Sequence, residues 1–281
     1  MNEATGTAGE VEYADDVCSL SLARRMAALL DRDPGELRPG DPLPRGWHVM
    51  LFNPATRQSG LREDGAAHLG FTMPDLGLPR LMMGGRKIDF NGDIPIGEAI
   101  RRESRLRSIS EKTGRSGRFV LVEVEHRITL ADGGAPVVVE TSSYVMLPKD
   151  NGTQAAADTG NAVEPQLPEG ALVRTVVPDV TLLFRYSAIT DNPHRIHYDL
   201  RYATEVEGYP ALVVNGSLPQ MMLLEMFREY VGREPSRYKS RNRAPIFCER
   251  PLTLSVAEAS ESFALRAHTA EGALAIEAEV W

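Results

Sequence analysis

The alternation of apolar and polar residues predicts a chain built mainly of β-strands, with two principal helices. The clearest strand covers residues 118–129, where apolar and charged side chains alternate as they do in a strand with one buried face. Its apolar positions are Val120, Val122, Val124 and Ile128. Further strands are predicted at 99–110, 136–147, 173–184, 245–256, 261–269 and 273–281.

Two segments carry apolar residues at the spacing of an α-helix. In residues 21–31, one face is formed by Leu22, Met26, Leu29 and Leu30. The second helix is predicted at 217–231 and is apolar on nearly all sides, so we expect it to be buried. Ser217 and Gln220 have the spacing of a capping box at its start. A short apolar segment at 47–52 fits one or two further helical turns.

The chain divides into two halves with a similar order of elements. Residues 148–170 contain few large apolar side chains and are predicted to be a linker between an N-terminal domain, 1–147, and a C-terminal domain, 171–281. Each half contains a helix followed by strands. This order favours an α+β fold in which each half is a curved antiparallel sheet wrapped round a central helix, with the two sheets joined edge to edge. Two unrelated α+β domains are the alternative.

Composition and charge exclude several classes of function. The chain has 281 residues, of which 42% are hydrophobic, and a formal net charge of −8, which disfavours a general nucleic-acid binder. No apolar run is long enough to cross a membrane. The acidic first twenty residues do not resemble a secretory signal, so a cytoplasmic protein is expected. Basic residues gather at 101–118 and 233–243, either as solvated faces or as a seat for a small polyanion.

The chemistry-bearing residues concentrate in one segment, 185–199. Two histidines, His194 and His197, lie there beside Asp191, Asn192 and Asp199. Three interpretations are open. The segment can be a turn whose histidines are only hydrogen-bonded, or a metal site of two imidazoles and a carboxylate, or an acid/base site.

The acid/base interpretation is favoured by the glycine and the predicted helix downstream of the histidines. An imidazole has a solution pKa near 6.5 and can therefore accept and return a proton at neutral pH. Gly216 stands at the start of the predicted helix, where backbone amides stabilise an oxygen that gains negative charge. Glycine suits a place that a substrate carbonyl must approach closely. These parts fit the addition of water to, or its removal from, a carbon–carbon bond beside a thioester carbonyl.

The same segments carry a resemblance to a known family. They read Arg185-Tyr186-Ser187-Ala188, Asn192-Pro193-His194-Arg195-Ile196-His197-Tyr198-Asp199, Glu207-Gly208-Tyr209-Pro210 and Val213-Val214-Asn215-Gly216. The first half adds Gly40-Asp41-Pro42-Leu43-Pro44, Trp47-His48, Leu78-Pro79-Arg80 and Lys112-Thr113-Gly114-Arg115-Ser116-Gly117. With these motifs the sequence resembles the MaoC-like hydratases and dehydratases. It resembles most the two-domain branch that contains mesaconyl-C4-CoA hydratase and mitochondrial 3-hydroxyacyl-thioester dehydratases.

The resemblance implies a double hot-dog fold and one active site, in the second half beside the junction of the halves. It implies reversible hydration of an enoyl thioester, with coenzyme A or the phosphopantetheine of an acyl carrier protein as part of the substrate, and neither a separate cofactor nor a metal. His197 is the expected acid and base. The residues expected to position water are Asp191, Asn192 and His194, and those expected to bind the thioester oxygen are Gly216 and Ser217. The residues expected to contact substrate or coenzyme A are Arg195, Tyr198, Val214, Asn215, Arg80 and Met83.

The sequence departs from the family pattern at the expected acid. The family places an aspartate five residues before the catalytic histidine, and here Asn192 holds that position, with Asp191 one residue earlier. A hot-dog thioesterase and a non-catalytic protein that binds acyl thioesters therefore remain as alternatives. We expect an acyl-thioester substrate, no nucleic-acid or membrane partner, and either a monomeric pseudo-dimer or a homodimer.

Overall fold

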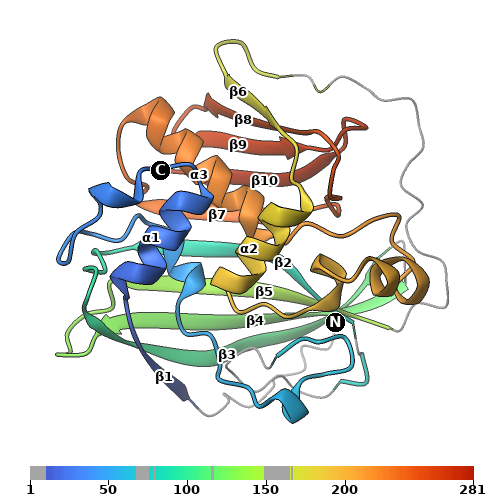
Figure 1. Ribbon diagram of the computed structural model, residues 1–281, viewed down its shortest axis with the longest axis horizontal. Helices are drawn as coiled ribbons and strands as arrows, with labels where there is room; N and C mark the ends of the chain where they lie inside the picture. Colours follow the sequence, from blue (N-terminus) through green and yellow to red (C-terminus); the bar gives the residue numbers. More distant parts are fainter. Residues whose placement is uncertain (1–10, 68–75, 79, 115–116, 149–164, 166) are drawn as a thin grey trace.

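A single antiparallel sheet of ten strands forms the framework of the protein (Figure 1). The computed structural model describes residues 11–67, 76–78, 80–114, 117–148, 165 and 167–281. The strands of the first half are β1 (Glu12–Val17), β2 (Arg80–Phe90), β3 (Ala99–Gly114), β4 (Gly117–Leu130) and β5 (Val138–Leu147). Those of the second half are β6 (Leu172–Val176), β7 (Arg237–Asn242), β8 (Leu252–Glu258), β9 (Phe263–His268) and β10 (Leu274–Val280).

The order of the strands shows that the two halves repeat one topology. The sheet runs β1-β3-β4-β5-β2-β7-β10-β9-β8-β6, so each half has the same order when read outward from the β2–β7 pair. We call this pair the seam, and in it Arg86 lies opposite Ser240. The halves therefore join edge to edge, and each covers one sheet edge of the other.

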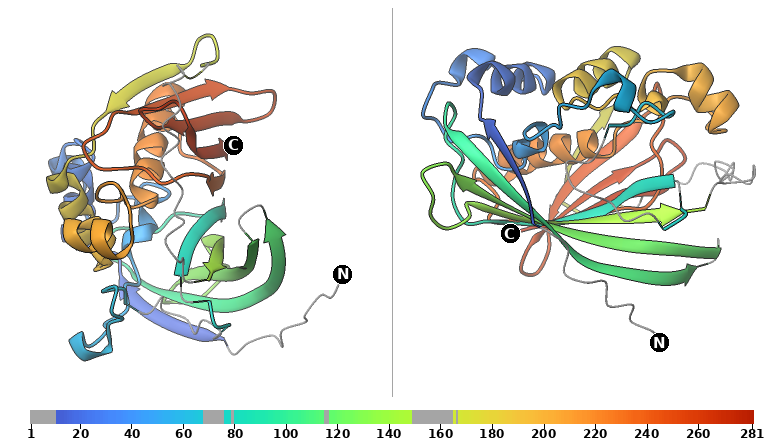
Figure 2. Two further views of the ribbon diagram at one scale, coloured as in Figure 1. Left: turned by 90° about the vertical axis from the view of Figure 1, so that its right-hand side faces the viewer. Right: turned by 90° about the horizontal axis from the view of Figure 1, so that it is seen from below.

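The helices lie together on one side of this curved sheet (Figure 2). They are α1 (Leu20–Leu29), α2 (Val180–Ile189) and α3 (Ser217–Val231). Ser19 and Asp179 cap α1 and α2, and these two helices pack against each other. Within the described ranges, no helix is long and apolar enough to span a membrane.

Helix α3 is buried, as its sequence predicts, and it packs on β8 and β9. The capping-box prediction at its start is wrong, because Gly216 occupies the N-cap and Ser217 is already helical. In the first half, the corresponding segment is only a short 3-10 helix, η2 (Trp47–Met50). It rests on α3 through a hydrogen bond of 2.9 Å from Trp47 Nε1 to Glu225 Oε1. One apolar core runs through both halves.

Two of the predicted strands are corrected by the structure. Residues 173–184 were expected to form one strand, but Pro178 ends β6 and Asp179 starts α2. The buried side chains Leu183, Tyr186 and Ile189 recur at helical spacing there. Residues 245–251 are not a strand, and β8 begins only after Pro251.

Strands β1, β2 and β7 were not predicted, because charged residues dominate their exposed faces. In β7 the buried residues Tyr238 and Ser240 alternate with exposed basic ones. Many basic side chains of the two arginine-rich stretches pair with carboxylates on neighbouring strands, as Arg237 does with Asp89 and Arg107 with Glu125. These pairs favour the interpretation of the two basic stretches as solvated faces over their interpretation as a binding site for a small polyanion. Most of the predicted linker, together with His68, Pro79, Arg115 and Ser116, lies outside the described residues, and the domain boundaries stay a prediction.

Candidate active site

His197 is held in a single orientation by the backbone around it. It ends a short 3-10 helix, η4 (Arg195–His197), and its Nδ1 lies 2.7 Å from the carbonyl oxygen of Val213. A carbonyl oxygen can only accept a hydrogen bond, so Nδ1 carries the proton and Nε2 has a lone pair. Burial lowers the pKa of His197 to about 4, since a charged ring is poorly solvated there. The ring is therefore neutral at pH 7 and ready to accept a proton at Nε2.

His194 stands beside this ring with its own partner from the first half. The two imidazoles meet edge to face, with ring centroids 5.7 Å apart. His194 Nε2 lies 3.8 Å from Asp64 Oδ2. Burial lowers the pKa of His194, although the charge of Asp64 acts in the opposite direction. His194 is thus a second polar group beside the ring of His197.

Asn192 and Asp191 shape the turn that leads into the histidines. Asn192 Oδ1 accepts a hydrogen bond of 3.2 Å from the amide of His194, which closes a side-chain turn. Asp191 has a left-handed backbone, with φ of 44°, and an exposed side chain. Among the described residues, no hydrogen bond or ion pair joins either side chain to His197. Their expected role in positioning water stays a prediction.

Val213, four residues before the start of α3, binds the histidine segment through both of its backbone groups: its carbonyl accepts from the ring of His197 and its amide donates to Ile196. Asn215 Oδ1 accepts hydrogen bonds from the amide and the hydroxyl of Ser217, at 3.2 and 2.7 Å. Ser217 Oγ in turn accepts a hydrogen bond of 2.8 Å from the hydroxyl of Tyr186. Within the described part of the chain, the amide of Gly216 has no acceptor. An N–H left over at a helix start can bind an oxygen that gains negative charge.

A hydrogen-bonded chain ties this helix start to the seam. Gln220 Nε2 donates 2.9 Å to Asn242 Oδ1, and Asn242 Nδ2 donates 3.0 Å to the carbonyl of Met83. A β-bulge interrupts β2 between Met83 and Gly85. A side chain at Gly85 would collide with the backbone of Ser240, since its Cβ would lie 2.2 Å from that carbonyl oxygen. Gly85 therefore permits the close contact of β2 with β7 at the seam. Sequence patterns gave no sign of Asn242, and they singled out Gln220 only as a capping residue and Tyr186 only as part of a family motif.

The other predicted binding residues divide into three groups. Arg195 donates to Asp199 Oδ2 at 2.8 and 3.0 Å and stacks over Tyr202, and Tyr198 is 50% exposed. Val214 and Asn215 are buried, Val214 within the apolar core. Arg80 starts β2 and pairs in register with Leu147. Their contacts with substrate stay predictions. Across the described ranges, no group of three or more His, Cys, Asp or Glu side chains could hold a metal ion.

A loop of the first half, residues 62–66, supports the histidine segment. The amide of Arg195 donates 2.8 Å to the carbonyl of Asp64. Gly65 has a φ of 81°, and a Cβ placed there would lie 2.4 Å from the carbonyl oxygen of Pro193. Sequence patterns gave no sign of this loop, because its contact partner lies in the other half of the chain.

We expect Gly65→Ala to lower both stability and turnover. The left-handed backbone alone costs roughly 1–2 kcal/mol for alanine, and the collision with Pro193 displaces the histidine segment. Gly40→Ala is the matched control, because Gly40 has a φ of 88° but no atom within 4 Å of an added Cβ. Urea unfolding and steady-state kinetics compare the two variants. Equal losses of stability and turnover in Gly65→Ala and Gly40→Ala would show that the contact with Pro193 is unimportant.

We also expect the protein to lose stability in mild acid. Burial lowers the pKa of both His126 and His197 to about 4, whereas in the unfolded chain each takes up a proton near its usual pKa of 6.5. Stability is therefore complete above about pH 6.5 and falls toward pH 4, by roughly 2 kcal/mol per histidine at pH 5. Urea unfolding at pH 7 and pH 5 measures the loss. In His197→Asn the loss of stability between pH 7 and pH 5 should be smaller by the roughly 2 kcal/mol that one histidine contributes. A loss equal to that of the wild type would contradict the lowered pKa of His197.

Comparisons with known proteins identify the family and the fold of the chain. Residues 46–248 match the family described as hydroxyacyl-thioester dehydratase type 2. The chain is 37% identical to mesaconyl-C(4)-CoA hydratase of Chloroflexus aurantiacus over 97% of its length and 95% of that protein. Among solved structures, a MaoC-like dehydratase from Phytophthora capsici is 15% identical and superposes with a TM-score of 0.69 over 97% of this chain and 95% of that one.

A Mycobacterium tuberculosis protein described as a double hotdog fold is 12% identical and superposes with a TM-score of 0.62. That comparison covers 98% of this chain and 96% of the other. At this level of identity the solved structures establish the fold alone. The predicted α+β double hot-dog fold is therefore confirmed.

Proposed function

Because the chain belongs to the hydroxyacyl-thioester dehydratase type 2 family and is a hydro-lyase of acyl thioesters, we propose that it reversibly hydrates an enoyl thioester, with His197 as acid and base. The observation that carries this proposal is the pairing of two groups. A neutral imidazole with a lone pair on Nε2 is anchored to Val213, and three residues later the amide of Gly216, at the start of α3, has no acceptor within the described residues.

In the proposed reaction the thioester oxygen accepts a hydrogen bond from the Gly216 amide. This bond draws electron density out of the conjugated carbon–carbon double bond, so water adds to the β-carbon while His197 Nε2 takes one of its protons. The enolate formed on the thioester oxygen is stabilised at the positive end of α3. His197 then returns the proton to the α-carbon, and the product is a 3-hydroxyacyl thioester. Dehydration proceeds through the same steps in reverse.

The side chains around His197 have supporting roles in this proposal. His194, Asn192 and Asp191 position the attacking water, and Ser217 and Asn215 fix the first turn of α3. Coenzyme A is the proposed thiol, since the relative that is 37% identical is named for a CoA thioester. The absence of an aspartate five residues before His197 is compatible with this scheme, because the imidazole alone can take the proton from water and return it to carbon.

The test is an absorbance assay of purified protein with crotonyl-CoA and mesaconyl-CoA. Loss of the conjugated double bond with retention of the thioester is the expected result, and mass spectrometry should show the gain of one water. A thiol-reactive dye in parallel reports free coenzyme A. Release of free thiol would replace the proposal by a thioesterase, and tight binding without turnover on either substrate would replace it by a non-catalytic binding protein.

A further inference from the structure

One carboxylate of the first half, that of Asp64, faces the histidine segment of the second half. Asp64 Oδ2 lies 3.8 Å from His194 Nε2, and the backbone carbonyl of Asp64 accepts the amide of Arg195. The next residue, Gly65, packs so closely on the carbonyl of Pro193 that a Cβ would collide with it. The proposed reaction gives Asp64 no role, although the fold places its side chain beside a site imidazole.

The orientation of this carboxylate is fixed on both of its oxygens. Asp64 Oδ1 accepts a hydrogen bond of 2.9 Å from the amide of Ala66, and Arg62 Nη2 lies 2.8 Å from Oδ2. The side chain of Asp64 is only 17% exposed. Because the backbone of its own loop engages Oδ1, Oδ2 is the oxygen that faces His194. The loop therefore presents one carboxylate oxygen to the imidazole in a defined position.

A carboxylate oxygen beside Nε2 selects one tautomer of His194. The oxygen can only accept, so it favours the tautomer with the hydrogen on Nε2, and at 3.8 Å it acts through electrostatic attraction rather than a full hydrogen bond. Burial lowers the pKa of His194, although the charges of Asp64 and Glu207 act in the opposite direction, and Arg62 adds to the lowering. The ring is therefore neutral at pH 7, and its Nδ1 has a lone pair.

The two site histidines thus carry their hydrogens on opposite nitrogens. In His197 the hydrogen is on Nδ1 and the lone pair on Nε2, and in His194 the arrangement is reversed. The ring centroids are 5.7 Å apart, which is comparable to two hydrogen bonds of about 2.8 Å through one bridging water. A water molecule has two hydrogens, and each needs an acceptor. Two imidazoles with lone pairs can supply both.

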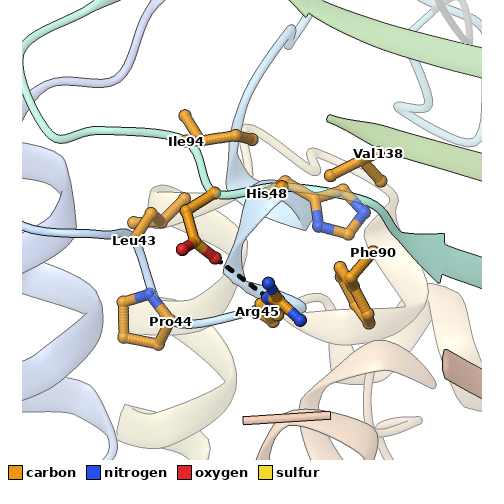
Figure 3. A pocket seen from close by; sticks show the side chains of 9 residues that line it. Leu43, Pro44, Arg45, His48, Phe90, Ile94 and Val138 are labelled. Atoms are coloured by element: carbon orange, nitrogen blue, oxygen red, sulfur yellow. Dashed lines mark hydrogen bonds and ion pairs between the residues drawn. The ribbon is translucent and has the colours of Figure 1, made fainter. Parts of the chain in front are cut away.

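The first half contains another histidine–carboxylate pair, which serves as a comparison. His48 Nε2 lies 2.9 Å from Glu140 Oε2, and both side chains are buried. His48 also lines a hollow of about 10 Å³ together with Phe90 (Figure 3). The phenyl ring of Phe90 packs edge to face against His48 and cannot exchange a proton. The ring that packs against His194 is instead the imidazole of His197.

We propose that Asp64 is a positioning residue of the hydration reaction and acts through His194. It holds His194 with the hydrogen on Nε2, so that Nδ1 accepts one hydrogen of the attacking water while His197 Nε2 takes the other as a proton. The inference rests on the proposed function for the reaction, whereas the tautomer of His194 can be measured without turnover. In this way the first half contributes a carboxylate to a site in which Asn192 stands at the family's aspartate position.

Asp64→Asn tests this role with little change of shape. The amide of Ala66 should hold the oxygen of the new side chain, so its NH₂ group turns toward His194 and favours the opposite tautomer. Nitrogen NMR of labelled imidazoles should show the hydrogen of His194 on Nε2 in the wild type and on Nδ1 in the variant, with His197 and His48 unchanged. We expect kcat for the best enoyl thioester to fall about tenfold to a hundredfold, with KM within about threefold.

Asp33→Asn is the matched control. Asp33 Oδ1 accepts the amide of Gly35 at 2.7 Å, in the same kind of turn as at Asp64, but it is exposed and belongs to a different loop. This variant removes the same charge, and we expect it to leave kcat and the tautomer of His194 unchanged. A second test places Asp64→Asn in a His194→Ala protein. There the further loss of kcat should be less than about threefold, because the group through which Asp64 acts is already missing.

A wild-type His194 with its hydrogen on Nδ1 would overturn the inference without any variant. An unchanged tautomer or an unchanged kcat in Asp64→Asn would also overturn it. So would a loss confined to KM, or a loss that is equally large with and without His194, because either would place the effect of Asp64 elsewhere. Thermal unfolding checks that each variant is folded. If the wild type has the expected tautomers but hydrates no enoyl thioester, the proposed function fails while the pairing of Asp64 with His194 stands.

Discussion

His197→Asn is expected to reduce kcat/KM by a factor of about 10² to 10⁴, the range over which a positioned acid or base accelerates proton transfer. Asparagine places its amide nitrogen where histidine has Nδ1, so the 2.7 Å hydrogen bond to the carbonyl of Val213 can persist. The variant therefore removes the lone pair of Nε2 while keeping the anchor of η4. The hydration assay with the best substrate measures the loss.

The matched control for this variant is His268→Asn. His268 is as buried as His197, but it lies on β9, and within the described residues no side-chain hydrogen bond joins it to η4 or to α3. We expect the control to retain turnover, and circular dichroism should show both variants folded. Activity within tenfold of wild type in His197→Asn would exclude this histidine as the base. His194 would then be the remaining imidazole beside the site.

Gly216→Pro is expected to lower kcat/KM by about 10² to 10³, because a single donor to a developing oxyanion has an effect of this size. Gly216 has a φ of −60°, which proline adopts without strain, and proline has no N–H to offer to the thioester oxygen. The change therefore removes one hydrogen-bond donor at a position whose backbone φ already matches that of proline.

Gly216→Ala separates the amide from the added side chain. A Cβ at this position would lie 3.0 Å from Asn242 Nδ2 in either variant, but alanine keeps the N–H. We expect alanine to lose less than tenfold. Similar losses in the two variants would mean that crowding of Asn242, rather than the missing donor, limits turnover. Thermal unfolding shows whether proline, which also restricts Asn215, has disturbed the start of α3.

Local sequence patterns predicted a helix or strand correctly wherever the burial of its side chains can be recognised within the segment itself. The strand at β4 follows from its alternating residues, because burial on one face leaves a period of two in the sequence. Helix α3 follows from the length of its nearly continuous apolar run. The patterns did not predict β7 as a strand, because its basic residues were interpreted as a surface patch. There Tyr238 and Ser240 are buried only because β2 lies alongside, a fact that the segment itself does not contain.

The candidate site likewise contains residues that local sequence patterns indicated and residues that they missed. The sequence alone identified His194, His197 and Gly216, because imidazoles near a glycine at a helix start are a chemical signal independent of packing. Asp64, Gly65 and Asn242 escaped notice, since each acts on a partner distant in the chain.

The type of chemistry and the repeated order of helix and strands are therefore determined by the sequence itself. Both depend on residues near one another in the chain, through side-chain periodicity and the intrinsic acidity of imidazole. Only the tertiary structure decided that Nε2 of His197 is the basic nitrogen, because the carbonyl of Val213 holds Nδ1. It also decided that Asp64 and Gly65 of the first half support the histidine segment, since these residues meet only when the chain is folded.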